Sequence, residues 1–531
     1  MEERIVVTAA LPYANGELHL GHIRSTYLPA DIYTRFMKAL GKDAIYVCAT
    51  DEHGTPIVAG AEKEGVSAEE FVKKYHEKDK ETFRKLLIDF DVFHRTSSKE
   101  NKEMTLLFFQ RAKERGYIYT KEVELYYCET CNRFLPDRFV IGICPHCGAE
   151  DQYSDGCEAC GRTIGPGEIK EPKCSVCRKK PSKKRSEHSF FNLKAFGPKL
   201  EEWIKGNKEM QDEVKNYVLN WIKEGLVDWD IVRDLDWGVP AEKGKVFYVW
   251  FDAPIGYISS TVALTPKWKE YWNGRIVHFI GKDIVYHHYL FWPAMIMAAD
   301  IGIKLPSAIP VRGHLTLEGR KFSKSRKHYI TVDEFLQVFP AEYLRYYETQ
   351  ITPFSLADSD FNLDDFANRI NNDLVGNIGN FAKRVSVLAE KLGFKYEESE
   401  EERRMREDVA KLKEEVVAEV ERFRIKEALD RIVNENSRYN ALLNEREPWK
   451  NAEVKNRTLT ACANWLKALG PLLSPYLPES SRKISEMVGG KCEWEEIGQK
   501  AIKIGRIGNL FRKIDRGEIE KIRGMLQKRA Q

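Results

Sequence analysis

Two short basic segments have residue types that suit the binding of a phosphate chain. His19-Leu20-Gly21-His22 follows the apolar run Ile5 to Ala10 and places two imidazoles three residues apart, on one face at the start of a helix. Such a start attracts phosphate, because free backbone N–H groups and the helix dipole point at it. Lys321-Phe322-Ser323-Lys324-Ser325 adds two lysines on a polar, Gly-flanked segment, which suits a clamp on pyrophosphate. Either segment alone is weak evidence, and the pair is the informative feature.

Eight of the eleven cysteines form four Cys-x-x-Cys pairs, which are Cys128/Cys131, Cys144/Cys147, Cys157/Cys160 and Cys174/Cys177. This spacing is typical of zinc knuckles, and four thiolates hold one tetrahedral zinc, so we expect two Zn²⁺ per chain. A redox-active pair would be expected once and not four times. Filled four-cysteine shells leave no open coordination position, so these sites should be structural.

Two groupings of the cysteine pairs are compatible with the spacing. In the nested grouping Cys144/Cys147/Cys157/Cys160 form an inner site that closes first, and Cys128/Cys131/Cys174/Cys177 form an outer site. In the sequential grouping the first pair joins the second and the third joins the fourth. We favour the nested grouping and keep the sequential one as the alternative.

The elements that must position these residues follow from composition and periodicity. A chain of 531 residues suggests about three domains at ~150 residues each. Short β-rich runs, Ile5–Leu11 and Ala44–Thr50, alternate with helical stretches, which predicts a parallel α/β sheet. We expect Val246–Phe251 and Ile276–Ile280 to complete that sheet, with the binding crevice at the carboxyl ends of its strands. Beyond Asp365 apolar residues recur every three or four positions, which predicts an all-α bundle.

Charge and hydropathy limit the classes of function. The net charge of +3 is close to neutral for this length, so any RNA-binding surface must be local. The longest apolar stretch, Tyr289 to Ala299, contains a proline and is too short to span a bilayer. The N-terminus leads directly into a predicted strand, so we expect no secretion signal and a cytoplasmic protein without membrane partners.

Four further segments extend the first basic motif into a recognisable set. They are Ala10-Leu11-Pro12-Tyr13-Ala14-Asn15-Gly16-Glu17-Leu18 before His19, Cys48-Ala49-Thr50-Asp51-Glu52-His53-Gly54-Thr55, Tyr248-Val249-Trp250-Phe251-Asp252-Ala253-Pro254-Ile255-Gly256-Tyr257 and Phe279-Ile280-Gly281-Lys282-Asp283-Ile284-Val285-Tyr286. In this order the chain resembles the methionyl-tRNA synthetases, a family of class I aminoacyl-tRNA synthetases, in an archaeal-like form with two zinc knuckle pairs. The resemblance runs from residue 5 to about residue 515.

The resemblance implies a Rossmann-like parallel-sheet catalytic domain, interrupted by a zinc-binding insertion and followed by an all-α anticodon-binding bundle. The corresponding ranges are 1–115 and 237–312 for the two catalytic halves, 116–236 for the insertion, 313–360 for the mobile lysine-loop region and 361–531 for the bundle. It implies a ligase that uses ATP with Mg²⁺ to convert L-methionine to methionyl-adenylate and then charges initiator and elongator methionine tRNAs. A monomer is the default expectation. The nested cysteine grouping also matches relatives that keep only the inner knuckle pairs.

The resemblance assigns roles residue by residue. The catalytic set is His19, His22, Lys321 and Lys324. The ATP-binding set is Gly21, Asp283, Lys321, Ser323, Lys324 and Ser325, with Phe322 where the family usually has methionine. The methionine-binding set is Leu11, Tyr13, Asp51, Trp250, Pro254, Tyr257, Ile284 and His288, with Asp51 placed to hold the α-ammonium. The anticodon-reading set is Asn380, Arg384 and Trp449.

Three alternative functions are weighed against this assignment. Another class I synthetase, for valine, isoleucine or leucine, would carry a large editing insertion, and one for cysteine would place zinc in its active site. A small-molecule nucleotidylyltransferase with a similar histidine motif would not need a helical domain. A zinc-knuckle RNA-binding protein without catalysis would not need the pocket motifs.

Overall fold

The structure is a computed structural model that describes residues 4–154, 157, 159–160, 162, 164, 167–323 and 327–530. At its centre lies a five-stranded parallel sheet with the strand order β14-β13-β1-β2-β3. The strands are β1 (Ile5–Ala9), β2 (Ala44–Thr50), β3 (Val92–Arg95), β13 (Arg275–Gly281) and β14 (Val311–Arg312). The order reverses direction on either side of β1, so the carboxyl ends of β1, β2 and β13 surround one crevice.

Successive side chains along each strand point to opposite faces of the sheet, and this divides the hydrophobic core into two layers. Ile5, Val7 and Ala9 point to one face of the sheet, and Val6 points to the other. The helices of this catalytic part are α1 (Leu20–His22), α2 (Leu28–Ala39), α3 (Thr55–Glu64), α4 (Ala68–Lys85), α5 (Lys99–Glu114), α8 (Val249–Asp252), α9 (Ile255–Leu264), α10 (Trp268–Trp272) and α11 (Trp292–Ala299). β1 and β2 are buried over their whole length, as expected of parallel strands covered on both faces.

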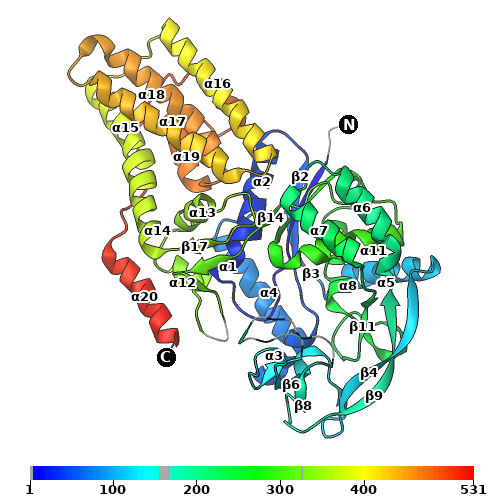
Figure 1. The fold of residues 1–531 in the computed structure, drawn as a ribbon. Helices are drawn as coiled ribbons and strands as arrows, with labels where there is room; N and C mark the ends of the chain where they lie inside the picture. The colour runs from blue at the N-terminus through cyan, green and yellow to red at the C-terminus, as the bar shows by residue number, and fades with distance from the viewer. Residues whose placement is uncertain are drawn as a thin grey trace.

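An insertion follows the third strand of the sheet. β4 (Ile118–Cys128) and β9 (Ser182–Phe191) form a long antiparallel ribbon, with β5 (Arg133–Phe134) and β10 (Trp229–Asp230) at its edges. β6 (Val140–Ile143), β7 (Gln152–Tyr153) and β8 (Lys170–Cys174) form the smaller sheet of the cysteine-rich tip. Helices α6 (Gly197–Gly206) and α7 (Asp212–Glu224) return the chain to the catalytic part, and Figure 1 shows the ribbon and tip below it.

The strand predicted at Val246–Phe251 is wrong. Only Val246 and Phe247 are extended, as β12, and they pair with β11 (Val232–Arg233) in a separate two-stranded sheet. The helix α8 begins at Val249. A short apolar run cannot be assigned to strand or helix by periodicity alone, and here tertiary context selects a helix.

The C-terminal part is helical as predicted, and its helices occupy the left and upper left of Figure 1. They are α12 (Val332–Leu336), α13 (Ala341–Gln350), α14 (Leu363–Arg369), α15 (Asn380–Leu392), α16 (Glu400–Glu421), α17 (Ile425–Arg446), α18 (Ala452–Leu473) and α19 (Pro478–Met487). The strands β15 (Leu315–Leu317), β16 (Arg320–Lys321) and β17 (Ser359–Phe361) precede and join this region. The last helix, α20 (Arg516–Ala530), leaves the bundle and returns toward α12.

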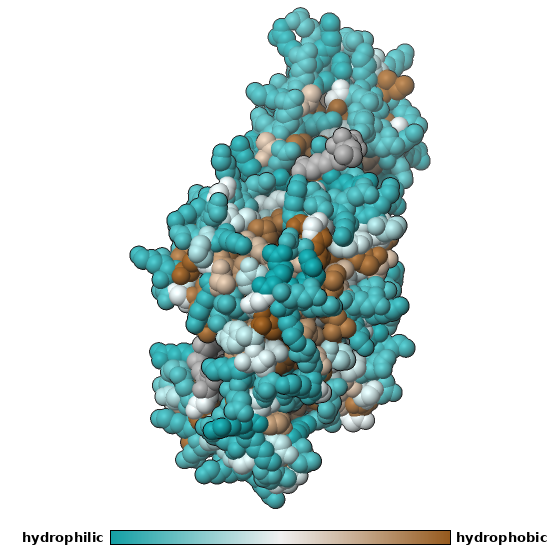
Figure 2. All heavy atoms as spheres, turned by 90° about the vertical axis from the view of Figure 1, so that its right-hand side faces the viewer, coloured by the Kyte–Doolittle hydropathy of each residue, from teal (hydrophilic) through white to brown (hydrophobic). Residues whose placement is uncertain are grey.

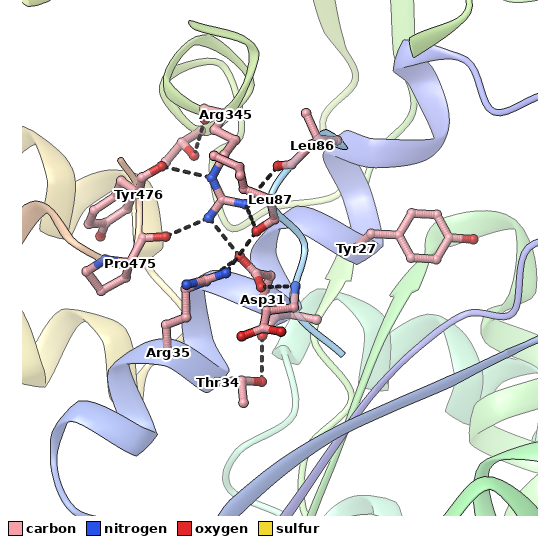
Figure 3. Close-up of polar contacts among 12 residues, drawn as sticks. Tyr27, Asp31, Thr34, Arg35, Leu86, Leu87, Arg345, Pro475 and Tyr476 are labelled. Carbon is pink, nitrogen blue, oxygen red and sulfur yellow. Dashed lines mark hydrogen bonds and ion pairs between the residues drawn. The ribbon is translucent and has the colours of Figure 1, made fainter. Parts of the chain in front are cut away.

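A buried arginine joins the bundle to the catalytic part (Figure 3). Arg345 of α13 pairs with Asp31 of α2, Nη2 to Oδ2 at 2.7 Å, and both side chains are inaccessible to solvent. Its guanidinium also donates to four main-chain carbonyl oxygens, those of Leu86, Leu87, Pro475 and Tyr476. One side chain therefore connects three segments that are distant in sequence.

The surface is mostly hydrophilic, in line with the high content of charged residues. Figure 2 shows one face, on which hydrophobic residues gather mainly in the central part. Among the described residues, no helix combines the length and the hydropathy that a membrane crossing requires.

Candidate active site

The two basic segments come together through main-chain hydrogen bonds. The amide of Leu20 donates to the carbonyl of Ile330 at 3.2 Å, and the amide of Val332 donates to the carbonyl of Leu18 at 2.9 Å. His19 and Thr331 thus form an antiparallel bridge. The chain just after the lysine segment is in this way fixed against the histidine segment.

Ring stacking adds a side-chain contact between the segments. The rings of His19 and His22 stack with centroids 3.5 Å apart, and Phe322 stacks on His19 at 4.8 Å with an interplanar angle of 11°. Gly21 suits this tight contact, because a Cβ at this position would lie 3.0 Å from the Phe322 ring and 3.2 Å from the His19 ring. Lys324 and Ser325 lie outside the described residues.

A cavity of about 490 Å³ opens at the carboxyl ends of β1, β2 and β13. The predicted residues that line it are Leu11, Tyr13, His19, Gly21, His22, Asp51, Trp250, Pro254, Tyr257, Asp283, Ile284, His288 and Lys321. Ser323 does not line it and instead forms a bridge with His328. One cavity thus brings together His19, His22 and Lys321 and all eight residues of the predicted amino-acid pocket.

Buried hydrogen bonds connect Tyr257, His288 and Ile284 at the floor of the pocket, and they define the tautomer of His288. His288 Nδ1 lies 3.1 Å from the carbonyl of Ile284, so it carries the hydrogen, and Nε2 accepts from the Tyr257 hydroxyl at 2.9 Å. Burial lowers the pKa of His288 to about 4. His288 is therefore neutral at pH 7, and the pocket floor presents an uncharged, largely apolar surface.

The polar end of the pocket is formed by Asp51, at the carboxyl end of β2. Its side chain is buried, and Oδ1 has no hydrogen-bond partner among the described residues. Burial, together with the charge of Asp252, raises the pKa of Asp51 well above its usual value. A buried carboxylate oxygen that faces a cavity without a partner suits a cationic group of a ligand.

The aromatic wall contains a contact that the motifs did not specify. His287 stacks on Trp250 with centroids 3.6 Å apart. Burial lowers the pKa of His287 to about 3, so this ring is neutral as well.

Sequence reasoning missed several residues of the cavity, among them His314, Thr316 and Asp358. His314 Nε2 lies 3.4 Å from Asp283 Oδ1, and its amide donates to Asp358 Oδ1 at 2.7 Å. His314 comes two residues after β14, so the rule that crevices form at strand carboxyl ends could have found it. Asp358 is far in sequence from every strand of the main sheet, and no sequence signal marks it.

The eight cysteines form two quartets with the nested grouping. Cys128, Cys131, Cys174 and Cys177 are one group and Cys144, Cys147, Cys157 and Cys160 the other, with all sulfur atoms of a group within 4.8 Å of one another. Neighbouring sulfurs lie 3.4 and 3.9 Å apart in the outer group and 3.9 and 3.6 Å in the inner one. A tetrahedral zinc with bonds of about 2.3 Å separates its ligand sulfurs by about 3.8 Å, so both quartets fit zinc.

A second candidate surface lies on the helical bundle. The Arg384 guanidinium lies over the Trp449 ring, 5.8 Å from its centroid, and both residues line a shallow cavity of about 370 Å³. The indole is 40% exposed, so Trp449 is not a core residue. Asn380 is exposed one helical turn before Arg384 on the same face of α15.

The parallel sheet with its histidine and lysine segments at one cavity defines a class I aminoacyl-tRNA synthetase. The profile of the family described as tRNA synthetases class I (M) matches residues 5–386. The chain belongs to the methionyl branch of that class, the methionyl-tRNA synthetase family. The family, the ligase class and the fold class predicted from the sequence are thereby confirmed.

Similar proteins support this assignment. The methionine–tRNA ligase of Methanopyrus kandleri is 44% identical over 98% of this chain and 82% of its own length. That of Methanocaldococcus jannaschii is 44% identical over 98% of this chain and 81% of its own. A solved Mycobacterium tuberculosis methionyl-tRNA synthetase in complex with methionyl-adenylate has a TM-score of 0.80 at 23% identity, covering 96% of this chain and 99% of that one. At that identity the match supports the fold alone.

Proposed function

We propose that this chain activates L-methionine with ATP and transfers the methionyl group to the terminal adenosine of methionine tRNAs. In the first step the amino-acid carboxylate attacks the α-phosphorus and pyrophosphate leaves. In the second step a ribose hydroxyl takes the acyl group. The observation that carries the proposal is the meeting of His19, His22 and Lys321 at one cavity with the amino-acid pocket.

The basic residues act by stabilising charge and not by covalent catalysis. Negative charge grows on phosphate oxygens as the carboxylate attacks, and donors fixed in place before the reaction are the most effective stabilisers. His19 and His22 supply N–H donors at the α-phosphate, and Lys321 and Lys324 hold the pyrophosphate. Asp283 binds the ribose hydroxyls, while Gly21, Ser323 and Ser325 shape the nucleotide site. Mg²⁺ accompanies ATP and neutralises part of its charge.

The amino-acid pocket selects methionine by shape and polarity. Asp51 receives the α-ammonium, and the aromatic and aliphatic walls receive the thioether, which is polarisable and makes favourable contacts with rings. Both pocket histidines are neutral, so no charge opposes the burial of an uncharged side chain.

Two Zn²⁺ ions hold the tip of the insertion, one in each cysteine quartet. Filled four-thiolate shells make these ions structural. Asn380 and Arg384 hydrogen-bond anticodon bases, and Trp449 stacks on one of them, which is a common way of reading unpaired RNA. We retain the domain boundaries given above, a monomeric state, a cytoplasmic location and both initiator and elongator tRNAs as parts of the proposal.

The decisive experiment is amino-acid-dependent ATP–pyrophosphate exchange with each of the twenty amino acids, together with a metal assay on the same sample. We expect exchange with methionine only and two zinc atoms per chain. Exchange with another amino acid in place of methionine would overturn the substrate assignment.

A further inference from the structure

Two buried side chains behind the amino-acid pocket have no role in the chemistry described above. His53 Nδ1 and Asp252 Oδ2 lie 2.7 Å apart, and the two residues are 3% and 0% exposed. Neither residue is among those that line the cavity. A buried pair of hydrogen-bonded polar side chains is not in general more stabilising than apolar residues of the same size, so its presence calls for a local explanation.

The pair joins two segments that each contribute residues to the pocket. His53 follows Asp51 by two residues, so it belongs to the segment with the predicted ammonium ligand. Asp252 lies in α8, between Trp250 and Pro254 of the apolar wall. The hydrogen bond therefore fixes the polar end of the pocket relative to its wall.

A third pocket residue depends on the same segment. The Tyr13 hydroxyl donates to the main-chain carbonyl of His53. Gly54 is needed for this approach, because its φ is +97° and a Cβ would lie 2.7 Å from the Tyr13 hydroxyl oxygen. The Tyr13 side chain and the Asp51 carboxylate thus both depend on where His53 is held.

Other side chains around the pair also make hydrogen bonds to the same two segments, but none of those described connects His53 to Asp252. Asn101 Nδ2 donates to Asp252 Oδ2 at a longer distance of 3.4 Å, and Trp237 Nε1 donates to the carbonyl of Glu52 at 2.7 Å. Asp252 Oδ1 has no hydrogen-bond partner among the described residues. The hydrogen bond from His53 is therefore the shorter of these two side-chain contacts of the Asp252 carboxyl group.

We propose that His53 and Asp252 are positioning residues for recognition of the α-ammonium group of the substrate. Their hydrogen bond keeps Asp51 and Tyr13 aligned with the wall formed by Trp250 and Pro254. The inference rests on the proposed function, since it concerns the amino-acid substrate of that site. It predicts that loss of the pair weakens binding of the amino group and leaves ATP binding unchanged.

The test uses His53→Gln, Asp252→Leu and Asp252→Asn in the full chain, with folding checked by the melting temperature. We expect His53→Gln and Asp252→Leu to raise the KM for methionine in the exchange assay by about 10-fold or more, the effect of losing a short hydrogen bond to a buried carboxyl group. The KM for ATP should change less than about two-fold. Asp252→Asn keeps an oxygen acceptor for His53 and should restore most of the methionine affinity.

A ligand comparison separates positioning from general damage. The dissociation constants of methionine and of 4-(methylthio)butanoate, which lacks the amino group, are measured for wild type and His53→Gln. Only the constant for methionine should rise. If the amine-free acid binds wild type too weakly to measure, two other results test the inference. They are the change in the KM for methionine relative to that for ATP, and the difference between Asp252→Asn and Asp252→Leu.

The matched control is His188→Gln, which removes a buried histidine that lies 2.6 Å from Asp230 in the insertion. His188→Gln should leave the ratio of the KM for methionine to the KM for ATP unchanged. Equal losses for methionine and ATP, or no loss in His53→Gln, would overturn the inference. A wild-type protein that shows no methionine-dependent exchange would instead overturn the proposed function.

Discussion

Phe322 stacks on His19 with ring centroids 4.8 Å apart, so the lysine segment and the histidine segment touch through a side chain as well as through the main chain. Aromatic pairs of this kind contribute about 0.5–1.5 kcal/mol beyond burial. The stack therefore links Phe322, and with it the neighbouring Lys321, to the histidine segment.

Replacing Phe322 should therefore slow amino-acid activation. We expect Phe322→Ala to lower kcat/KM for ATP in the exchange assay by a few-fold to about 10-fold. Phe322→Met, the residue usual in the family, keeps a contact with the ring and should stay close to wild type. If both variants behaved alike, the stack would have no part in positioning the loop.

The nested and sequential groupings of the cysteines predict different numbers of bound zinc atoms for a variant in which two cysteines are replaced. Cys144→Ser with Cys160→Ser removes two ligands of the inner quartet, so one zinc should remain per chain. Under the sequential grouping the same change would damage both sites and leave none. Metal analysis by mass spectrometry distinguishes these outcomes, and Cys492→Ser, outside both quartets, should retain two zinc atoms.

Trp449 offers an exposed indole on the bundle, and its loss should affect only the step that needs tRNA. Base–aromatic stacking contributes about 1–3 kcal/mol, so we expect Trp449→Ala to lower kcat/KM for tRNA charging by roughly 5- to 150-fold. Exchange with methionine and ATP should be unchanged. A parallel loss in both assays would show that the indole supports folding instead.

Loss of the buried ion pair between Arg345 and Asp31 should lower the free energy of unfolding substantially. Arg345→Met leaves the Asp31 carboxylate buried without this partner, and breaking a buried pair costs about 3–5 kcal/mol. The urea midpoint should fall accordingly. Arg369→Met breaks a surface pair with Asp365 and should cost about 0–1 kcal/mol, which makes it the matched control.

His288 predicts a pH dependence of stability. Its pKa is about 4 when folded, against about 6.5 in the unfolded chain, so the unfolded state binds more protons between these values. Stability should therefore fall as the pH decreases from about 6.5 to about 4. His288→Gln should make this fall smaller, measured as urea midpoints at pH 7 and pH 5. Equal falls in both proteins would contradict the neutral, buried imidazole.

Residues with strong local constraints were predictable from the sequence. Ala44–Thr50 was predicted as a strand with its observed bounds, because a run buried on both faces of a parallel sheet is continuously apolar. The cysteine quartets were predictable because zinc fixes both the residue type and the spacing. The roles of the predicted site residues remain predictions, although the cavity contains most of those described.

The remaining features depend on tertiary structure. Val246–Phe251 has strand-like composition, but its second half begins the helix that carries Trp250. His53 and Asp252 lie 199 residues apart in sequence, and no local pattern connects them. Their pairing becomes visible only when two sides of one pocket are placed together.

The main-chain pairing of Leu18 and Leu20 with Ile330 and Val332 has a consequence for biosynthesis. A nascent chain still short of residue 330 contains the imidazoles but not the strand-like segment that fixes them. Contacts between such distant residues form late during folding, because a long loop must close first. Competence to bind nucleotide should therefore arise late in translation, after most of the chain has left the ribosome.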